Sequence, residues 1–447
     1  MSQNLRKKVA VKASRRNVGL SPNILSQGGT PSSSRHNTDE EDAWSEFSTE
    51  TVDSWTSIDS KINEDRISED VDWKEEVLQS IDNLEEKRTS VRENALSTLI
   101  RLLSRKYTFD LLDSRSYSLL DLLCRSIKKE KSIKENRLAT KVMSLLFITL
   151  GEEQDKMYQT VLPLLKYTSI NSASPEVKGA CIKTLGLVCF IAGSHTDAIE
   201  LLEFFSNIII TSGKSVNATN NPVTITSALN SYGLLFSGLW GNSRKGSIRS
   251  REEFERVMPG HIKQLESTSM EVRVASGENI ALMFESLGIG RRVEQNDKWG
   301  NHDHLTHLLN TLATDSNRHR AKADRKVQRS VFRDILKTVE DGDRIQEKLK
   351  FNKKTVYFST WARILQLRAF RDVLADGLQA HFLENELLQA IFEFVPPPTL
   401  DSPRSRPDHD FNTGSDTDTS VSKRKTKGKQ AKNRRENKRR GDLLEVG

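Results

Sequence analysis

The sequence predicts an all-α protein: an armadillo/HEAT-like α-solenoid with a small helical C-terminal domain and disordered termini. Helix-favouring residues dominate the chain, whereas Gly and Pro are sparse, at 23 and 11 of 447 residues. Apolar residues recur at helical spacing from about residue 71 to residue 396. A short motif returns at intervals of 42 to 49 residues, close to the period of armadillo and HEAT arrays.

Residues 1–70 are rich in Ser, Thr and Asn and lack apolar periodicity, so we predict a disordered N-terminal region. An acidic stretch within it, 39–59, is either a short motif that docks on a basic, apolar groove or a solvated linker. Its aromatic residues are Trp44, Phe47 and Trp55. The basic residues before Asp39 are compatible with a mitochondrial presequence, but Gly and Pro residues from Pro22 to Pro31 interrupt a helix there.

Residues 71–292 form the predicted repeat domain. The repeats open with Val91-Arg92, Ile133-Lys134, Val177-Lys178, Val223-Thr224 and Val272-Arg273. The expected capping or starting residues before them are Ser90, Ser132, Ser174 with Pro175, Asn221 with Pro222, and Ser269. Helical hairpins of this kind bury their apolar faces against their neighbours in a stack. The alternative is a set of unrelated amphipathic helices that happen to be evenly spaced.

Residues 301–397 form the predicted helical C-terminal domain. Helices are expected over 302–313, 321–341, 361–375 and 377–394. Gly342 ends the second of these helices, and three consecutive prolines from Pro396 end the last. Residues 398–447 are rich in Ser, Thr, Asp, Lys and Arg, which predicts a disordered basic tail.

Positive charge is concentrated in two zones of a chain whose net charge is +7. Residues 318–371 contain 16 basic and 6 acidic residues, a difference of +10, and residues 401–447 contain 13 and 8, a difference of +5. Such zones suit a polyanionic partner, which is a nucleic acid, an acidic protein surface or anionic lipid.

The first candidate binding site is a basic helix within 315–333. If the chain is helical from Ala321, one stripe carries Lys322, Arg325, Lys326, Arg329 and Arg333. Another face carries Val327, Val331, Phe332, Ile335 and Leu336. A basic stripe on a packed helix neutralises several phosphates at once, so its affinity falls steeply with salt. The alternative is an ordinary solvated helix face.

The second candidate is the tail segment 423–440, which holds eleven Lys or Arg residues and one acid, Glu436. It has no aliphatic side chain larger than that of Ala431, so it cannot form a core alone. It is a nuclear localisation signal, an RNA-binding arm or both, and the alternative is a solubilising tail. The residues assigned to binding are Lys423, Arg424, Lys425, Arg434, Arg435, Arg439 and Arg440.

Four aromatic residues lie beside basic residues after the first candidate site: Phe351, Tyr357, Phe358 and Trp361. They could stack on bases, but helical spacing favours core packing for them.

No catalytic or cofactor-binding constellation is visible, so we expect no enzyme, no cofactor and no small-molecule substrate. Residues 241–247 resemble a phosphate-binding loop, but they lack the Lys between the second Gly and the Ser, and they follow a helical pattern rather than a strand. His304 and His307, beside His302 and Asp303, could reach one ion, but no further cluster completes a zinc site. The other carboxylates are interpreted as surface partners of Lys and Arg on helix faces.

The three cysteines, Cys124, Cys181 and Cys189, match neither a zinc signature nor a disulfide framework. We predict that they are buried in a reducing compartment. The longest apolar stretch, Leu185–Ala192, is far shorter than the ~20 residues of a membrane span, so no membrane partner is expected.

Several segments resemble the interferon-related developmental regulator family. The stretch 312–322, with Thr314-Asp315-Ser316-Asn317-Arg318-His319-Arg320, and the stretch 328–336 closely resemble its C-terminal domain. The stretch 272–285 is similar to the end of its N-terminal repeat domain. Lys350-Phe351, Asn385-Glu386-Leu387-Leu388 and Phe392-Glu393 also match. The resemblance covers about residues 70–397 and implies an armadillo-like domain followed by a small helical one.

The resemblance also implies a regulator of gene expression, acting in the cytoplasm, the nucleus or both. Some members bind inactive ribosomes through basic C-terminal elements, and others are nuclear transcriptional co-regulators that act with deacetylase complexes. The first activity makes rRNA the expected partner, with contacts at Arg318, His319, Arg320, Lys322, Arg325, Lys326 and Arg329. The second makes a protein complex the partner, so both hypotheses stand at this point.

Overall fold

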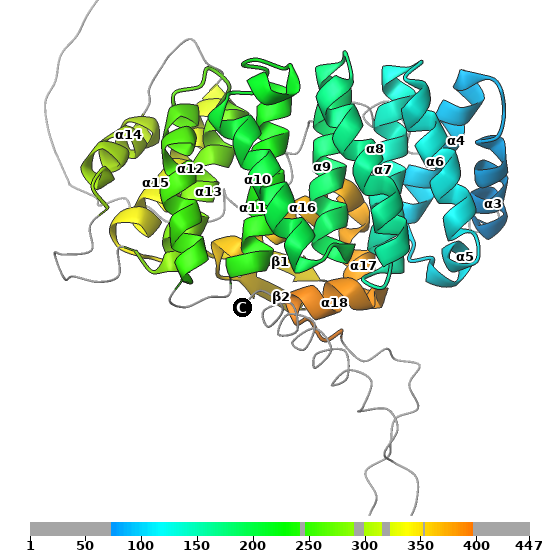
Figure 1. Cartoon of the computed structure of the whole chain (residues 1–447). Coiled ribbons are helices and arrows are strands. Elements are labelled where there is room, and N and C mark those ends of the chain that lie inside the picture. Colours follow the sequence, from blue (N-terminus) through cyan, green and yellow to red (C-terminus); the bar gives the residue numbers. More distant parts are fainter. Residues whose placement is uncertain (1–72, 242–245, 290–298, 315–321, 352–353, 397–447) are drawn as a thin grey trace, which may run out of the picture. The chain divides into compact units, whose positions relative to one another are not determined.

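A computed structural model describes residues 73–241, 246–289, 299–314, 322–351 and 354–396 (Figure 1). All of them belong to one structural unit, Trp44–Gly447. The predicted disordered regions, 1–70 and 398–447, lie outside the described residues.

One row of helices, called here the inner helices, begins at the five predicted repeat starts. The row contains α4 (Thr89–Arg105), α7 (Ile133–Leu150), α9 (Pro175–Ala192), α11 (Pro222–Trp240) and α13 (Met270–Leu287). Each packs against the next, and α15 (Lys322–Glu340) packs against α13 as the next member of the row. The predicted all-α helical-repeat array is therefore confirmed.

A second row, the outer helices, supplies the other half of each hairpin. It contains α3 (Trp73–Asn83), α6 (Ser116–Lys129), α8 (Asp155–Asn171), α10 (His195–Ile210), α12 (Ile248–Leu265) and α14 (His302–Thr314), with the short α5 (Phe109–Asp113) before α6 and η1 (Lys214–Val216) after α10. Each long outer helix packs on the inner helix that follows it in the chain, as Figure 1 shows. The predicted domain boundary between 292 and 301 stays a prediction.

Four of the five predicted caps are confirmed. The side chains of Ser132, Ser174, Asn221 and Ser269 each accept a hydrogen bond from a backbone N–H in the first turn of the helix that follows. Ser90 is the exception, because α4 already begins at Thr89 and its N-cap, Arg88, makes no side-chain cap. The three cysteines are buried and unpaired, as predicted.

At three of the five repeat starts, the second residue of the repeat motif is a buried cation that bonds beyond its own helix: Arg92, Lys178 and Arg273. The guanidinium of Arg92 donates to both carboxylate oxygens of Glu135 on α7, at 2.7 and 2.8 Å, and also to the carbonyl oxygens of Glu86 and Lys87. Lys178 likewise donates to the carbonyl oxygen of Ile170, at 2.7 Å, and to that of Val216. Glu135 is 1% exposed, so the interpretation of the carboxylates as surface partners is wrong for it.

A strand pair that the sequence reasoning missed follows α15. β1 (Glu347–Phe351) and β2 (Lys354–Phe358) form an antiparallel hairpin in which Lys348 lies opposite Tyr357. Phe351, Tyr357 and Phe358 lie in these strands, so the expectation that they follow helical spacing is wrong. Alternation with period 2 over these two short runs, with Asn352 between them, is the signal that was available.

After the hairpin the chain runs back along the inner helices. This return segment contains α16 (Trp361–Leu374), η2 (Ala375–Gly377), α17 (Leu378–Glu384) and α18 (Glu386–Phe392), so the predicted single helix over 377–394 is broken at Asn385. The break has a cause: the Asn385 side chain caps α18 and donates to the carbonyl oxygen of Ile148 on α7, at 2.9 Å.

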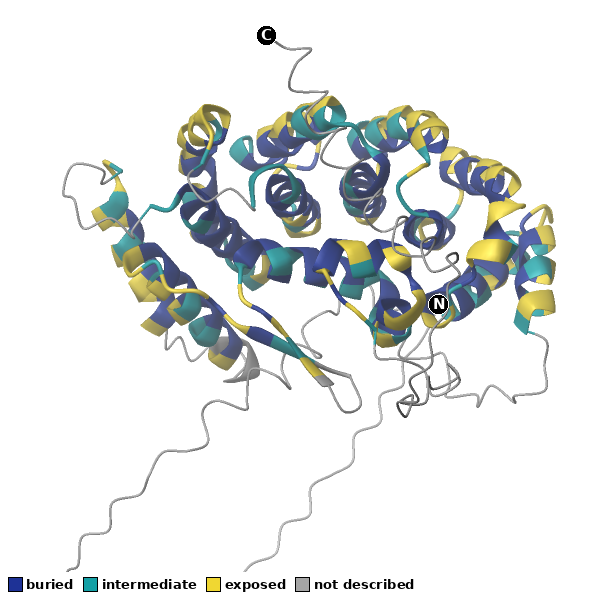
Figure 2. Ribbon diagram, turned by 90° about the horizontal axis from the view of Figure 1, so that it is seen from below, coloured by how far each residue is buried: buried dark blue, intermediate teal, exposed yellow. Residues whose placement is uncertain are grey.

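The return segment covers one side of the inner row. α16 packs on α11 and α13, whereas η2 and α17 pack on α4. His381 on α17 lies 3.0 Å from the carbonyl oxygen of Leu103, and Gln366 donates to Ser237 on α11 at 3.1 Å. Figure 2 shows the helix pairs end-on, around buried, dark-blue segments that run across them. The inner helices of this chain are therefore partly covered by its own C-terminal part.

Candidate nucleic-acid interface

Helix α15 lies in the predicted binding region, and it has a buried apolar face and an exposed basic face. Val327, Val331, Phe332, Ile335 and Val339 are buried where α15 packs on α13 and α14. The opposite side carries three exposed cations, Lys326, Arg333 and Lys337. Their spacing of seven and four residues places them on one stripe. We call these three residues the α15 ridge.

A glycine on α13 allows α15 to approach closely. A Cβ atom added to Gly277 would lie 2.9 Å from a ring carbon of Phe332 and 2.8 Å from the Ile335 side chain. Both distances are shorter than real Cβ contacts, so only Gly fits here without a shift. The packing on one side of α15 thus fixes which residues face outward on the other.

The structure describes some of the predicted site residues and not others. Lys326 is exposed, whereas Arg329 is half-buried and has an interaction partner. Lys322 and Arg325 lie in α15, but their side chains are outside the described part of the chain. Residues outside the described ranges altogether are Arg318, His319, Arg320, Lys423, Arg424, Lys425, Arg434, Arg435, Arg439 and Arg440. Arg333 and Lys337 extend the stripe toward the end of the helix.

The α15 ridge keeps its positive charge. Among the residues that the structure describes, none forms an ion pair with Lys326, Arg333 or Lys337. The acid within the same stretch, Asp334, is half-buried, and burial raises its pKa against the attraction of Lys337 and Arg333. Unpaired, solvated cations on one stripe are available to an external anion.

The β1–β2 hairpin continues the basic zone. Glu347 and Phe358 face the helices and are buried, whereas Tyr357 is 57% exposed and shares the outward face with its register partner Lys348. The sequence-based expectation of core packing is therefore confirmed for Phe358 and Trp361 but is wrong for Tyr357.

A polar cluster behind the hairpin ties it to the helix array. The Trp361 indole N–H donates to Thr338 on α15 at 2.9 Å, and its backbone N–H donates to Glu285 on α13 at 2.7 Å. Arg371 on α16 donates to Glu347 on β1 at 2.8 Å. These bonds hold α15, the hairpin and α16 in one arrangement, so the α15 ridge and the outward hairpin face are fixed relative to each other.

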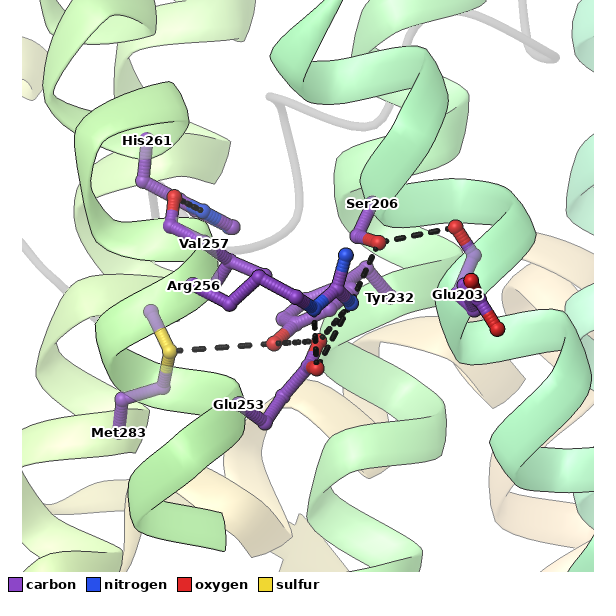
Figure 3. A network of polar contacts seen from close by, with 8 residues as sticks. All are labelled: Glu203, Ser206, Tyr232, Glu253, Arg256, Val257, His261 and Met283. Carbon is purple, nitrogen blue, oxygen red and sulfur yellow. Dashed lines mark hydrogen bonds and ion pairs between the residues drawn. The ribbon is translucent and has the colours of Figure 1, made fainter. Parts of the chain in front are cut away.

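Four polar residues form a network between the helices, in which Tyr232 and His261 are buried and Arg256 is exposed. Figure 3 shows Tyr232, Glu253, Arg256 and His261 in one cluster. The Tyr232 hydroxyl donates to Glu253 at 3.1 Å, and Arg256 donates to Ser206 at 2.8 Å. Burial raises the pKa of Tyr232 well above its ordinary value and lowers that of His261 to about 4. Tyr232 and His261 are inaccessible to solvent, and the hydrogen bonds of the cluster join α10, α11 and α12.

The described residues include a hollow between two helices but no group of metal ligands. A hollow of about 330 Å³ lies between α8 and α10 and is lined by Gln159, Leu162, Pro163, Lys166, Asp197, Glu200 and Leu201. Within the described ranges, no three His, Cys, Asp or Glu side chains are grouped so that they could hold a metal ion. In the same part of the chain, every helix is too short or too polar to cross a membrane.

Comparison with known proteins identifies the family. The model of the interferon-related developmental regulator family matches residues 43–340, which end at the last residue of α15. Interferon-related developmental regulator 1 of Mus musculus is 34% identical over 349 residues, 76% of each chain. Regulator 2 of Mus musculus is 32% identical over 348 residues, 76% of this chain and 77% of that one. An uncharacterized protein of Schizosaccharomyces pombe is 23% identical over 338 residues, 71% and 74% of the two chains. This chain therefore belongs to the interferon-related developmental regulator family.

Proposed function

We propose that this chain is a non-enzymatic regulator of gene expression that associates with the ribosome by binding rRNA through basic residues of its C-terminal third. The observation that carries the proposal is the α15 ridge: three exposed cations on one stripe, without ion-pair partners among the described residues. The predicted contacts at Arg318, His319, Arg320, Lys322, Arg325 and Arg329 extend the same basic zone. The basic tail, 423–440, adds a second one.

The physical basis is neutralisation of phosphates. Each Lys or Arg that contacts a phosphate releases condensed counterions, so binding strengthens as salt falls. A helix packed on one side holds its cations in fixed positions, which lowers the entropy lost when RNA binds. This mechanism needs no catalytic group and works in the cytoplasm and in the nucleus.

The covered inner row supports an external surface as the binding site. In this chain, α16, η2 and α17 occupy one side of the inner helices. A partner that lay along that side would have to displace Gln366, His381 and Asn385 from their buried hydrogen bonds. The α15 ridge is reached without any such rearrangement.

Sedimentation of the full chain with ribosomes through a sucrose gradient tests the proposal. We expect the wild-type chain in ribosomal fractions at low salt and free chain at high salt. The variant Lys326→Glu/Arg333→Glu/Lys337→Glu should stay at the top of the gradient. A matched control reverses three exposed cations at the other end of the array, Lys106, Lys128 and Lys129, and should sediment like the wild type. Equal behaviour of the two variants, or a wild type absent from ribosomal fractions at low salt, contradicts the proposal.

The second candidate is a nuclear co-regulator scaffold that binds proteins such as deacetylase complexes. Exposed tyrosines on the outer helices, Tyr117 and Tyr167, favour a protein-binding surface there. Deleting 423–440 should then abolish nuclear import while partner capture in extracts persists. If the variant that reverses the α15 ridge also fails to capture the protein partner, that partner binds at the basic zone instead.

A further inference from the structure

The start of α4 places two cations and an apolar residue around a serine. Lys87 and Arg88 are exposed in the loop before the helix, and Ser90 is exposed in its first turn. Val91, the next residue, is half-buried. Within the described part of the chain, neither Lys87 nor Arg88 forms an ion pair. These side chains are therefore accessible at the surface that the described residues form.

The Ser90 hydroxyl has no structural role among the described residues. The sequence predicts that it caps α4, but the helix begins one residue earlier, and its N-cap, Arg88, makes no side-chain cap. At the corresponding places in later repeats, the hydroxyls of Ser132, Ser174 and Ser269 accept capping hydrogen bonds. The described residues form no such bond with the Ser90 hydroxyl. A chemical change at Ser90 therefore breaks no cap.

We propose that Ser90 is a phosphorylation site for a protein serine/threonine kinase that selects basic residues before the acceptor. Kinases distinguish their substrates in part by patterns of charge. In a kinase of this class, carboxylates of the substrate cleft pair with cations two and three residues before the acceptor, and an apolar pocket takes the residue after it. Arg88, Lys87 and Val91 occupy these three places.

The co-reactant of the transfer is ATP, which the kinase binds with magnesium. Ser90 Oγ attacks the γ-phosphorus while the hydroxyl proton passes to the aspartate base of the kinase. The bond from the γ-phosphorus to the bridging oxygen breaks, and ADP leaves. To enter the cleft, the first turn of α4 has to open, and helix ends fray. The backbone bonds that oppose this opening run from the N–H groups of Val91 and Arg92 to the Arg88 carbonyl oxygen, at 3.2 and 3.3 Å.

Helix α4 is compatible with the phosphate that results. The N-cap residue leaves the N–H groups of the first turn without a side-chain acceptor, and no acid lies in that turn. A phosphate there accepts hydrogen bonds from these groups and is favoured by the positive end of the helix dipole. Glu93, three residues after Ser90, is bound by Lys134 at 3.4 Å and by Ser132 at 2.6 Å, which offsets its repulsion of the phosphate.

The chain carries the same arrangement at Thr108, where the acceptor is buried. Arg105 and Lys106 stand three and two residues before Thr108, and Phe109 follows it. Both cations are exposed, but Thr108 is 4% exposed and its hydroxyl oxygen is buried. The motif alone does not distinguish the two acceptors, whereas their burial does. In the folded chain, we therefore expect the kinase to modify Ser90 and not Thr108.

Incubation of the full-length chain with ATP and the purified catalytic subunit of the cAMP-dependent kinase, which prefers this arrangement, tests the inference. The chain carries Thr108→Ser, so that both acceptors are serine. Mass spectrometry after cleavage at glutamate measures the phosphate on the segment 87–93 and on the segment that contains position 108. Two synthetic peptides, 85–93 and 103–111 with the same substitution, show that the kinase recognises both arrangements when neither is folded.

We expect both peptides to be phosphorylated, but the folded chain only at Ser90, and Ser90→Ala should abolish the phosphate on the segment 87–93. Arg88→Ala should slow this phosphorylation by about tenfold, because one charge pair with the kinase is lost. The matched control is Arg105→Ala, which removes an exposed arginine elsewhere and should leave the rate at Ser90 unchanged. Thermal unfolding of the variants checks that each chain is folded.

Three results would overturn the inference. The first is a folded chain without phosphate at Ser90, whether or not its peptide is modified. The second is equal phosphorylation of the folded chain at positions 90 and 108, because burial would then not decide the site. The third is an equal rate in Arg88→Ala and Arg105→Ala, because the basic residues would then not select the acceptor. None of these measurements involves RNA or ribosomes, so their outcome leaves the proposed function untouched.

Discussion

Arg273 of α13 donates a 2.5 Å hydrogen bond to the side-chain oxygen of Gln328 on α15, just as Arg92 of α4 donates to Glu135 on α7. Both arginines occupy the second position of the repeat motif, and both also hold carbonyl oxygens of the loop before their own helix. The same kind of hydrogen bond therefore joins α4 to α7 and α13 to α15. Because α15 is joined to α13 in this way, the helix that carries the exposed cations is anchored like a repeat.

Replacing Arg92 by Ala should destabilise the chain by about 3 kcal/mol, because the buried Glu135 carboxylate loses the charge that compensates it. Arg92 is 3% exposed, so water cannot take over its role. The measurement is the free energy of unfolding in urea. The control is Arg125→Ala, which removes the exposed pair with Asp121 and should cost about 0.5 kcal/mol or less. Similar losses for the two variants would contradict a structural role for the repeat cation.

Substituting Gly377 by Ala should loosen the return segment from α4. A Cβ atom at this position would lie 1.7 Å from the carbonyl oxygen of Ser104, so the two backbones must move apart. We expect a loss of at least about 2 kcal/mol and faster proteolysis after residue 377. Gly300→Ala is the matched control, because a Cβ atom there meets nothing within 4 Å. Unchanged protection of the return segment in Gly377→Ala would show that this close approach does not hold it.

Burial of His261 predicts a loss of stability in mild acid. Its ring is inaccessible to solvent, lies 3.2 Å from the carbonyl oxygen of Val257 and contacts Tyr232, and burial lowers its pKa from 6.5 to about 4. The unfolded chain binds the proton first, so the contribution is fully present above pH 6.5 and is lost as the pH falls toward 4. The loss from this group reaches about 3 kcal/mol. His381, whose pKa is also lowered by burial, adds in the same direction.

Urea unfolding at pH 7.5 and at pH 4.5 measures this effect. The variant His261→Phe retains an aromatic ring and removes the titrating group, so its stability should change less between the two values. His304→Phe is the control, since His304 is exposed and its removal should leave the pH dependence unaltered. A wild type equally stable at both pH values would refute the assignment.

The repeat array could be predicted because its signals are local. Four caps were identified from sequence because Ser or Asn before a helical block satisfies the free N–H groups of the first turn. The outward direction of Lys326 and Arg333 followed from helical spacing against Val327 and Phe332.

Two features depend on contacts between distant residues, and no local pattern contains them. Asn385 breaks a helical stretch because its side chain bonds to Ile148, 237 residues away in the sequence. The sequence around Glu135 is typical of a surface acid. Its buried partner, Arg92, lies 43 residues earlier in the chain, so no local pattern shows the pair. The hairpin was missed because each strand is only five residues long. Without the strands, helical spacing predicted core packing for the exposed Tyr357 as well as for the buried Phe358 and Trp361. Alternation alone would have separated Tyr357 from Phe358.

Removing residues 423–447 should reduce the salt dependence of RNA binding without affecting the fold. The segment 423–440 carries eleven cations and no large aliphatic side chain, so it contributes charge but no core. For every phosphate that the shortened chain no longer neutralises, the slope of log affinity against log salt should fall by about 0.7 for a single strand. Binding at several salt concentrations measures the slope, and thermal unfolding checks that the array is intact. A matched control exchanges the Lys and Arg residues of 423–440 among themselves, which preserves the charge and should preserve the slope. If the truncated chain keeps the full slope, the RNA-binding residues lie in the helical part alone, and the tail serves another purpose such as nuclear import.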